Sequence, residues 1–487
     1  MTRLSTLALL LSLAMGLLGA GCQKKGSTAA KRSLLVHCAA SLKVPVEAVA
    51  RDYEQKEGVE VRLQFGASQT LLAGIEVSHT GDLYLPADDS YFAAAREKKL
   101  VTTTVPMATQ TAVLITAKGN PKGVKAMADL ARPEVRLAVA SSGATAIGKL
   151  LQQTLGANWD SLAKKAVMTA ATVTEAANAV KADGADATFI WDSMLPQYAG
   201  FEAVPVPEIT GVTAKVAVGL LSCAGSSAEA MRFARYLSAK DRGLPVFKQQ
   251  GFAVVDGEPW ATEPELLLYA GSMLRPAIDK TVTDFEQREG VRVTRVYNGC
   301  GILVGQMKAG SAPDAYFACD NEFMNQVQDN FEPRDEIAQN ELVILVPKGN
   351  PKNVATLRDL TKPGLRVGIG HEKQCAMGWL TQRTLVEGGI KDEFMKNVTV
   401  QTPTGDMLVN QMQAGSLDAA VTYLSNAIGA GDKLDAVRIQ GLKCAVATQP
   451  FAIAKGSPYK QTMQRLHDLL RSVQSKERFT DEGFQWK

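Results

Sequence analysis

Hydroxyl residues stand in this chain where apolar, strand-like runs give way to helix-like ones. Ser41 and Ser272 each follow a short apolar run, and Ser68 follows the next such run of the first half. The first turn of a helix has unpaired N–H groups and the positive end of the helix dipole, so it can hold an anion without a charged side chain. A serine adds a hydroxyl donor. For one serine alone, a helix cap worth about 1 kcal/mol is the better explanation.

The pattern recurs because the chain contains one domain twice. Segments 34–252 and 266–484 repeat the same order of motifs. The sequence Lys-Gly-Asn-Pro-Lys, for example, occurs at 118–122 and again at 348–352. We expect an exposed turn there, after a strand that crosses between two lobes. Because similar loops recur in both copies, an anion site is favoured over a simple cap.

Each copy is predicted to be an α/β unit. In the first copy an apolar strand over 34–39 leads to a helix with one apolar face at the i, i+3, i+4, i+7 spacing, formed by Val46, Val49, Ala50 and Tyr53. Gly58 suits the left-handed residue that ends a helix, and a β-rich run follows over 59–65. This alternation predicts mainly parallel sheets covered by helices. Such sheets bind ligands at the carboxyl ends of their strands, where the serines stand.

The composition is that of an ordinary globular protein. The 487 residues are 46% hydrophobic and 21% charged, with a formal net charge of +3. This length suits about three or four domains of usual size, which fits two copies of two lobes. A nucleic-acid-binding protein would show a basic stripe. We therefore expect no nucleic-acid partner, and we expect a monomer.

The N-terminus predicts export. Arg3 precedes an apolar stretch over 4–18, which small residues follow up to Cys22. A membrane span needs about 20 apolar residues, so this shorter stretch indicates a secretory signal. The small residues before Cys22 resemble a bacterial lipobox, although Gly19 stands where leucine is usual. The resemblance implies a lipid on Cys22 and anchoring at a membrane; plain secretion is the alternative.

These features divide the chain into four parts. We predict a lipoprotein signal peptide over 1–22, a polar flexible tether over 23–33, and two solute-binding domains over 34–257 and 264–487. Between the two domains, glycine and proline interrupt both periodicities.

The six other cysteines show no CxxC pair and no zinc-like spacing, so no metal cofactor is expected. Three lie in apolar runs and are interpreted as small buried hydrophobes: Cys38, Cys223 and Cys444. Cys300, His371 and Cys375 leave two alternatives open. A thiol beside an imidazole can act as nucleophile and base, or the three side chains can bind a soft metal. Spacing alone establishes neither.

Both halves resemble the periplasmic molybdate-binding protein of ABC transporters, a type II solute-binding protein, over nearly all of their length. In the first half the resemblance rests on Ala39-Ala40-Ser41-Leu42, Phe65-Gly66-Ala67-Ser68 and Gly81-Asp82-Leu83-Tyr84 through Asp88. In the second it rests on Ala270-Gly271-Ser272, Gly299-Cys300-Gly301, Gln306-Met307-Lys308-Ala309-Gly310 and Pro313-Asp314-Ala315-Tyr316 through Asp320. It implies a tandem pair of two-lobed units.

The resemblance also implies the ligand-binding residues, because members of this family hold a tetrahedral oxyanion with two serines, two backbone amides and a tyrosine. In the first half these positions are Ser41, Ser68, the amides near Ala146 and Val173, and Trp191. In the second half they are Ser272, Cys300, the amides near Ala376 and Gly405, and Tyr423. Neither half carries the complete set, because an indole replaces the phenol in one and a thiol replaces a hydroxyl in the other. Which half binds stays open.

The sequence thus predicts a periplasmic or cell-surface lipoprotein, not an enzyme. It would bind molybdate or tungstate, without a further cofactor, for delivery to an ABC permease in the membrane. Two alternatives remain. One is a degenerate tandem scaffold or sensor without a transport role, and the other is a cysteine-dependent enzyme that uses Cys300.

Overall fold

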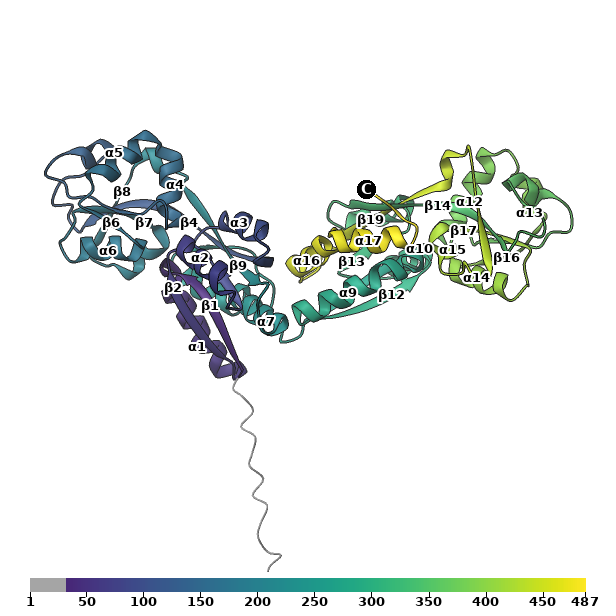
Figure 1. Ribbon diagram of the computed structural model, residues 1–487, viewed down its shortest axis with the longest axis horizontal. Coiled ribbons are helices and arrows are strands. Elements are labelled where there is room, and N and C mark those ends of the chain that lie inside the picture. Colours follow the sequence, from purple (N-terminus) through teal and green to yellow (C-terminus); the bar gives the residue numbers. More distant parts are fainter. Residues whose placement is uncertain (1–31) are drawn as a thin grey trace, which may run out of the picture.

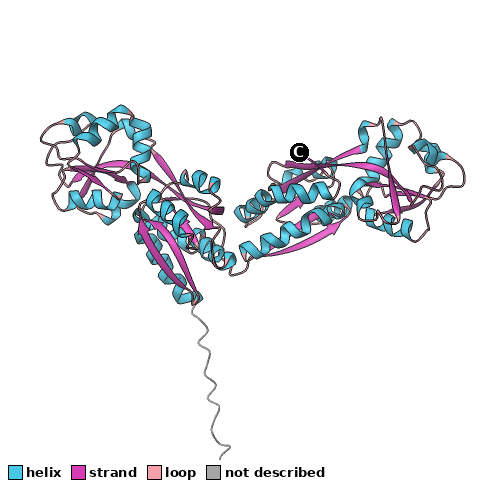
Figure 2. Ribbon diagram, in the orientation of Figure 1, coloured by secondary structure: helices cyan, strands magenta, loops and turns pink. Residues whose placement is uncertain are grey.

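The computed structural model describes residues 32–487, which form two copies of an α/β unit joined in the middle of an elongated molecule (Figure 1). Within each copy the strands lie inside the two lobes and helices cover them (Figure 2). The predicted tandem of two-lobed α/β units is confirmed, but the sheets are mixed rather than mainly parallel, because each copy contains both parallel and antiparallel strand pairs. The predicted signal peptide, the predicted lipidation site at Cys22 and most of the predicted tether lie outside the described residues.

The first copy runs from β1 to β10. Its strands are β1 (Ser33–Ala39), β2 (Glu60–Gly66), β3 (Leu83–Leu85), β4 (Val101–Ala117), β5 (Ala138–Ala140), β6 (Met168–Ala170), β7 (Ala187–Trp191), β8 (Phe201–Val204), β9 (Thr213–Leu221) and β10 (Ala253–Val254). Its main helices are the 3-10 helix η1 (Ala40–Leu42), α1 (Lys43–Glu57), α2 (Ser68–Ser78), α3 (Tyr91–Glu97), α4 (Ala146–Leu155), α5 (Ala157–Lys165), α6 (Val173–Lys181), α7 (Ser227–Ser238) and α8 (Gly243–Gln249).

The second copy repeats this order. Its strands are β11 (Glu265–Gly271), β12 (Arg292–Asn298), β13 (Ala315–Phe317), β14 (Asp335–Pro347), β15 (Val367–Gly370), β16 (Val398–Thr402), β17 (Ala419–Tyr423), β18 (Leu434–Arg438), β19 (Val446–Ile453) and β20 (Gln485–Trp486). Its main helices are η5 (Ser272–Leu274), α9 (Arg275–Glu289), α10 (Cys300–Lys308), α11 (Asn321–Asn325), α12 (Ala376–Glu387), α13 (Lys391–Met395), α14 (Gly405–Gln413), α15 (Leu424–Ile428), the 3-10 helix η8 (Lys443–Ala445), α16 (Lys460–Leu470) and α17 (Val473–Asp481).

One long strand links the two lobes of each copy. The first part of β4 pairs antiparallel with β9, and its last residues pair with β7 and β8 in the other lobe. In the second copy β14 pairs first with β19 and then with β17 and β18. The Lys-Gly-Asn-Pro-Lys sequences follow β4 and β14 directly, as predicted.

Helix α1 shows why the first lobe folds as the sequence predicts. Its predicted apolar stripe is buried, with Tyr53 fully enclosed. The helix ends at Gly58, whose φ of 68° is the left-handed conformation that glycine adopts without strain. The chain then returns as β2, parallel to β1. This arrangement brings the carboxyl ends of β1 and β2, and the residues that follow them, to one edge of the sheet.

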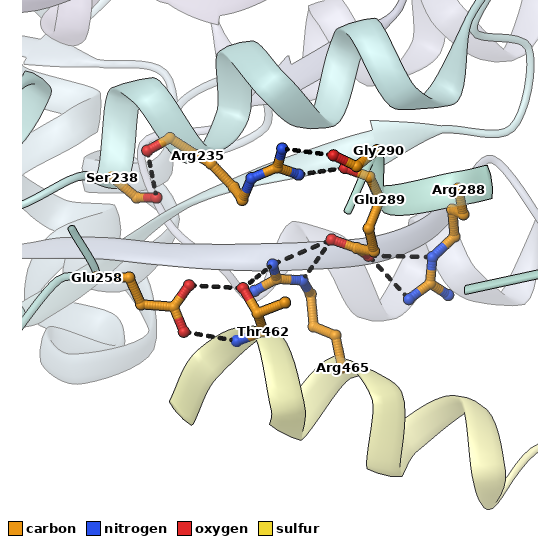
Figure 3. Close-up of polar contacts among 8 residues, drawn as sticks. All are labelled: Arg235, Ser238, Glu258, Arg288, Glu289, Gly290, Thr462 and Arg465. Carbon is orange, nitrogen blue, oxygen red and sulfur yellow. Dashed lines mark hydrogen bonds and ion pairs between the residues drawn. The ribbon is translucent and has the colours of Figure 1, made fainter. Parts of the chain in front are cut away.

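A buried ionic network joins the two copies (Figure 3). Arg235 of α7, in the first copy, donates to the main-chain carbonyls of Glu289 and Gly290 in the second. The Glu289 carboxylate, with no exposed surface, pairs with Arg465 at 3.0 Å. Glu258, between the copies, accepts hydrogen bonds from the backbone N–H and the hydroxyl of Thr462. Because buried charges are costly unless paired, this network sets how one copy sits against the other.

Two of the cysteine predictions are wrong. Cys38 is fully buried in β1, as predicted, but Cys223 lies in a turn and Cys444 in η8, each only partly buried. Among residues 32–487, no helix combines the length and the apolar character needed to cross a membrane.

Candidate functional site

A small cavity lies between the two lobes of the first copy, with a volume of about 20 Å³. It is lined by Ala39, Ala40, Ser41, Gly66, Ala67, Ser68, Ala87, Thr145, Ala146, Ile147, Thr172, Val173 and Trp191. All five positions predicted for the first half are therefore in one place. None of the lining side chains is ionisable, so the cavity is polar without being charged.

The starts of four helices surround this cavity. Ser41 lies in η1 directly after β1, and Ser68 is the first residue of α2 after β2. From the other lobe, Ala146 is the first residue of α4 and Val173 the first of α6. Trp191, the last residue of β7, is fully buried and also lines the cavity. The positive ends of several helix dipoles thus meet around one neutral space.

The hydrogen bonds leave particular donors free for a bound group. The Ser68 hydroxyl accepts a bond from the Ala87 N–H at 3.1 Å, so its own hydrogen remains to donate. The Ser41 hydroxyl is buried and has no partner among the described residues. A buried polar group without a partner is costly, and such groups in native proteins often await a ligand or water.

Threonine caps decide which backbone amides remain at the cavity. Thr145 accepts from the third amide of α4, and Thr172 does the same for the third amide of α6. The first amides of a helix have no partner inside the helix. The amides of Ala146 and Val173, on the cavity wall, are therefore among those left for a ligand. The sequence interpretation missed both caps, although a threonine just before a helix is the usual cap signal.

Both copies are closed. In the first copy the Gln69 N–H, at the start of α2, donates to the Ala144 carbonyl of the other lobe at 3.0 Å. The second copy has the corresponding bond from the Gly301 N–H to the Gln374 carbonyl at 3.1 Å. A Cβ placed on Gly301 would lie 1.9 Å from the Lys373 carbonyl oxygen, so the lobes of the second copy meet with no space for a side chain there.

One residue predicted for the second site, Ser272, does not correspond to Ser41 of the first copy. In both copies the 3-10 helix starts at the residue directly after the strand. Ser272, the first residue of η5, therefore corresponds to Ala40, the first residue of η1. Met273, which is 4% exposed, then occupies the place of Ser41. Ser272 is half-buried rather than enclosed. The second copy therefore has a thioether where the first has its unpartnered hydroxyl.

The other predicted residues of the second copy hold corresponding places. Cys300 begins α10, Ala376 begins α12, Gly405 begins α14, and Tyr423 ends β17. The Tyr423 hydroxyl is buried without a partner among the described residues. Asn426 fills the space beside Gly405, since a Cβ there would lie 2.3 Å from the amide oxygen.

Cysteine thiols of the second copy lie around the position that the Ser68 hydroxyl holds in the first copy. Cys300 Sγ lies 2.8 Å from Cys319 Sγ and also accepts from the Cys319 N–H at 3.1 Å. Burial raises the pKa of the Cys375 thiol to about 12. The sequence interpretation missed Cys319, because its counterpart Ala87 carries no functional group.

The alternatives for His371 lose support. Its Nδ1 accepts a hydrogen bond from the Lys373 N–H, and no hydrogen bond joins His371 to a thiol among residues 32–487. Within the same residues, no group of three or more His, Cys, Asp or Glu side chains is arranged to hold a metal ion.

Comparison with known proteins gives the same picture of two copies. The sequence model of the family described as bacterial extracellular solute-binding protein matches residues 34–253 and again residues 266–485. The molybdate-binding protein ModA of Escherichia coli K12 is 25% identical over 252 residues, 48% of this chain and 93% of that protein. ModA of Mycobacterium tuberculosis H37Rv is 26% identical over 200 residues, 39% of this chain and 72% of that protein. The match to the solved structure of the periplasmic molybdate-binding protein of Azotobacter vinelandii, with 15% identity and a TM-score of 0.39, covers 45% of this chain and 98% of that protein's chain. The resemblance to molybdate-binding proteins in a tandem duplication is confirmed.

Proposed function

Because the chain belongs to the bacterial extracellular solute-binding protein family, we propose that it captures a tetrahedral oxyanion outside the cytoplasm and delivers it to an ABC importer. Molybdate or tungstate is the proposed ligand. The observation that carries the proposal is the first-copy cavity, in which neutral donors converge and the Ser41 hydroxyl has no partner among the described residues. The related proteins of E. coli and M. tuberculosis, both named molybdate-binding, support it.

The size of the cavity favours a compact ion. Its volume of about 20 Å³ only slightly exceeds the roughly 10–15 Å³ that one water-sized sphere needs. An extended ligand, such as a peptide or a sugar phosphate, would not fit between the closed lobes. A single ion with four oxygens suits donors that approach from several helix starts at once.

The neutral donors favour an ion that carries no proton. Hydroxyls and backbone amides can satisfy every oxygen of a fully deprotonated oxyanion. A protonated ion would bring a donor of its own and leave it facing other donors, and an unpaired buried donor costs about 1–3 kcal/mol. This mechanism selects against monohydrogen phosphate and accepts molybdate, tungstate and sulfate alike, because all three are fully deprotonated.

Binding and release would follow from lobe movement. Ser41 and Ser68 come from one lobe, and Ala146, Val173 and Trp191 come from the other. A bound ion contacts both and so stabilises the closed form, while bending of β4, shared by the lobes, would open it. The importer would then accept the released ion. A lipid on Cys22, which lies outside the described residues, would keep the protein at the membrane.

The second copy supports a different role for that half. Met273 replaces the free hydroxyl and Cys300 replaces the second one, so two of the donors are lost or weakened. Its backbone amides at α12 and α14 remain. We propose that the first copy is the principal oxyanion site and that the second binds more weakly or serves as a scaffold held by the junction.

Titration calorimetry on the purified full-length chain, kept in detergent, tests this function. Molybdate, tungstate, sulfate and phosphate are titrated in separate runs, with thermal unfolding measured alongside. We expect molybdate and tungstate to release or absorb heat and to raise the unfolding temperature, and phosphate to do neither. Absence of heat and of stabilisation with all four ions would eliminate the oxyanion proposal.

A further inference from the structure

The second copy contains a thiol pair that the first copy lacks. The Sγ atoms of Cys300 and Cys319 are 2.8 Å apart, and both residues are buried. At the corresponding places the first copy has Ser68 and Ala87, joined by the same backbone-to-side-chain hydrogen bond. A hydroxyl and a methyl group have thus become two thiols in contact.

A further change makes room for this pair. Gly271 ends β11 where Ala39 ends β1. A Cβ on Gly271 would stand 1.9 Å from the Cys319 sulfur and 3.1 Å from the Cys300 sulfur. The alanine of the first copy would therefore collide with the thiols of the second. Three positions differ together, which indicates an arrangement of the second copy that depends on both sulfurs.

The hydrogen bonds give the two thiols different reactivity. Burial raises the pKa of the Cys300 thiol, but hydrogen bonding with the thiol and the N–H of Cys319 outweighs burial and holds the pKa below its ordinary value. The hydrogen bond to Cys300 and burial raise the pKa of Cys319. The thiolate is the form that attacks a disulfide, so Cys300 is the nucleophile. Cys319 is the resolving thiol, which attacks the resulting mixed disulfide.

Cys375, the third buried thiol nearby, belongs to the other lobe. It is the residue before α12, and its side chain makes no capping hydrogen bond to that helix. Burial raises its pKa to about 12, so the Cys375 thiol stays protonated.

We propose that Cys300 and Cys319 are a dithiol that a disulfide-containing oxidant converts into an intramolecular disulfide. The Cys300 thiolate attacks the oxidant RSSR, forms a mixed disulfide and releases RS⁻. The Cys319 sulfur, after losing its proton, then attacks the Cys300 sulfur and releases the second RS⁻. In total, two protein thiols and one RSSR become one protein disulfide and two RSH. The distance between the two sulfur atoms exceeds the S–S bond length of ~2.05 Å by only roughly 0.8 Å.

Lobe closure controls access to this pair. In the closed form Cys300 is fully buried and Cys319 is 5% exposed, beneath the contact between Gly301 and the loop of the other lobe. An oxidant therefore reaches the Cys300 sulfur only when the lobes separate. The rate of oxidation should follow the opening of the second copy.

Peptide mapping of the full-length chain tests the proposal. The reduced protein is incubated with oxidised glutathione, unreacted thiols are alkylated under denaturing conditions, and tryptic peptides are analysed by mass spectrometry. Lys308 lies between the two cysteines, so trypsin places them in separate peptides, 296–308 and 309–334. We expect these peptides to be linked in the wild type and in Cys375→Ser. In Cys319→Ala, which restores the first-copy residue, Cys300 should instead carry one glutathione.

Two glycine variants test the role of closure. Gly301→Ala places a methyl group against the Lys373 carbonyl, so we expect oxidation at least tenfold faster than in the wild type. Gly305→Ala, whose Cβ would meet nothing within 4 Å, is the matched control and should react at the wild-type rate. The proposal is overturned if both cysteines stay alkylatable in the wild type and in Gly301→Ala, or if Cys300 is linked to Cys375. Equal rates in all three proteins would contradict control by closure. None of these results requires an oxyanion to bind.

Discussion

Replacing Ser41 and Ser68 separately by alanine should separate stability from affinity. Among residues 32–487 the buried Ser41 hydroxyl has no partner, and the cavity has space for about one water molecule beside it. Ser41→Ala removes an unsatisfied group, so the ligand-free protein should unfold at the same free energy or a higher one. A hydrogen bond to a charged ligand is worth about 1.5–3 kcal/mol. Affinity for molybdate should therefore fall about 10- to 150-fold.

Ser68→Ala should change both quantities. The Ser68 hydroxyl accepts the Ala87 N–H, so its removal leaves a buried amide unpaired at a cost of about 1–3 kcal/mol. For a unit of this size, each kcal/mol lowers the unfolding temperature by about 2–4 °C. Affinity should fall as well, because the same hydroxyl hydrogen faces the ligand.

Thermal unfolding without ligand and calorimetry with molybdate measure the two effects on the same samples. A purely structural role for Ser41 predicts the opposite pattern, with lower stability and unchanged affinity. If Ser41→Ala melts as low as Ser68→Ala, or binds molybdate as tightly as the wild type, the assignment of a free donor to Ser41 is wrong.

Two further predictions concern buried charge in the second copy. Glu289→Gln leaves the buried Arg465 without its counter-charge and should lower the free energy of unfolding by about 3–5 kcal/mol in urea, whereas Glu263→Gln at an exposed pair should change it by less than about 0.5 kcal/mol. Burial raises the pKa of the Asp320 carboxyl from 3.8 to about 6, so the folded state binds its proton more tightly than the unfolded chain does. The free energy of unfolding should therefore fall as the pH rises from 4 through 6, by about 3 kcal/mol relative to Asp320→Asn. This variant keeps a side-chain acceptor for the Glu322 N–H. Parallel curves of unfolding free energy against pH for the two proteins would refute the prediction.

The sequence predicted those features of the fold that depend on residues close together in the chain. The buried stripe of α1 and the left-handed Gly58 follow from residues close together in the chain, and both are present. The first-copy positions also came together at one cavity, because each stands at the end of a strand or the start of a helix.

What the sequence did not predict depends on register and on distant contacts. Ser272 looked like the counterpart of Ser41, since both follow an apolar run, but Ser272 is the first residue of its 3-10 helix whereas Ser41 is the second. Cys319 shows no signal beside Ala87 until the fold brings it to Cys300. The bond from Arg235 to Glu289 joins different copies, and no periodicity in either helix predicts it.

Anomalous X-ray diffraction at the molybdenum edge, on crystals of the protein grown with molybdate, tests the central claim most directly. The account predicts a molybdenum peak in the first copy, with oxygens within hydrogen-bond reach of the Ser41 and Ser68 hydroxyls and of the Ala146 and Val173 amides. A strong peak elsewhere with that cavity empty, or a peak there whose oxygens avoid both serines, would contradict it.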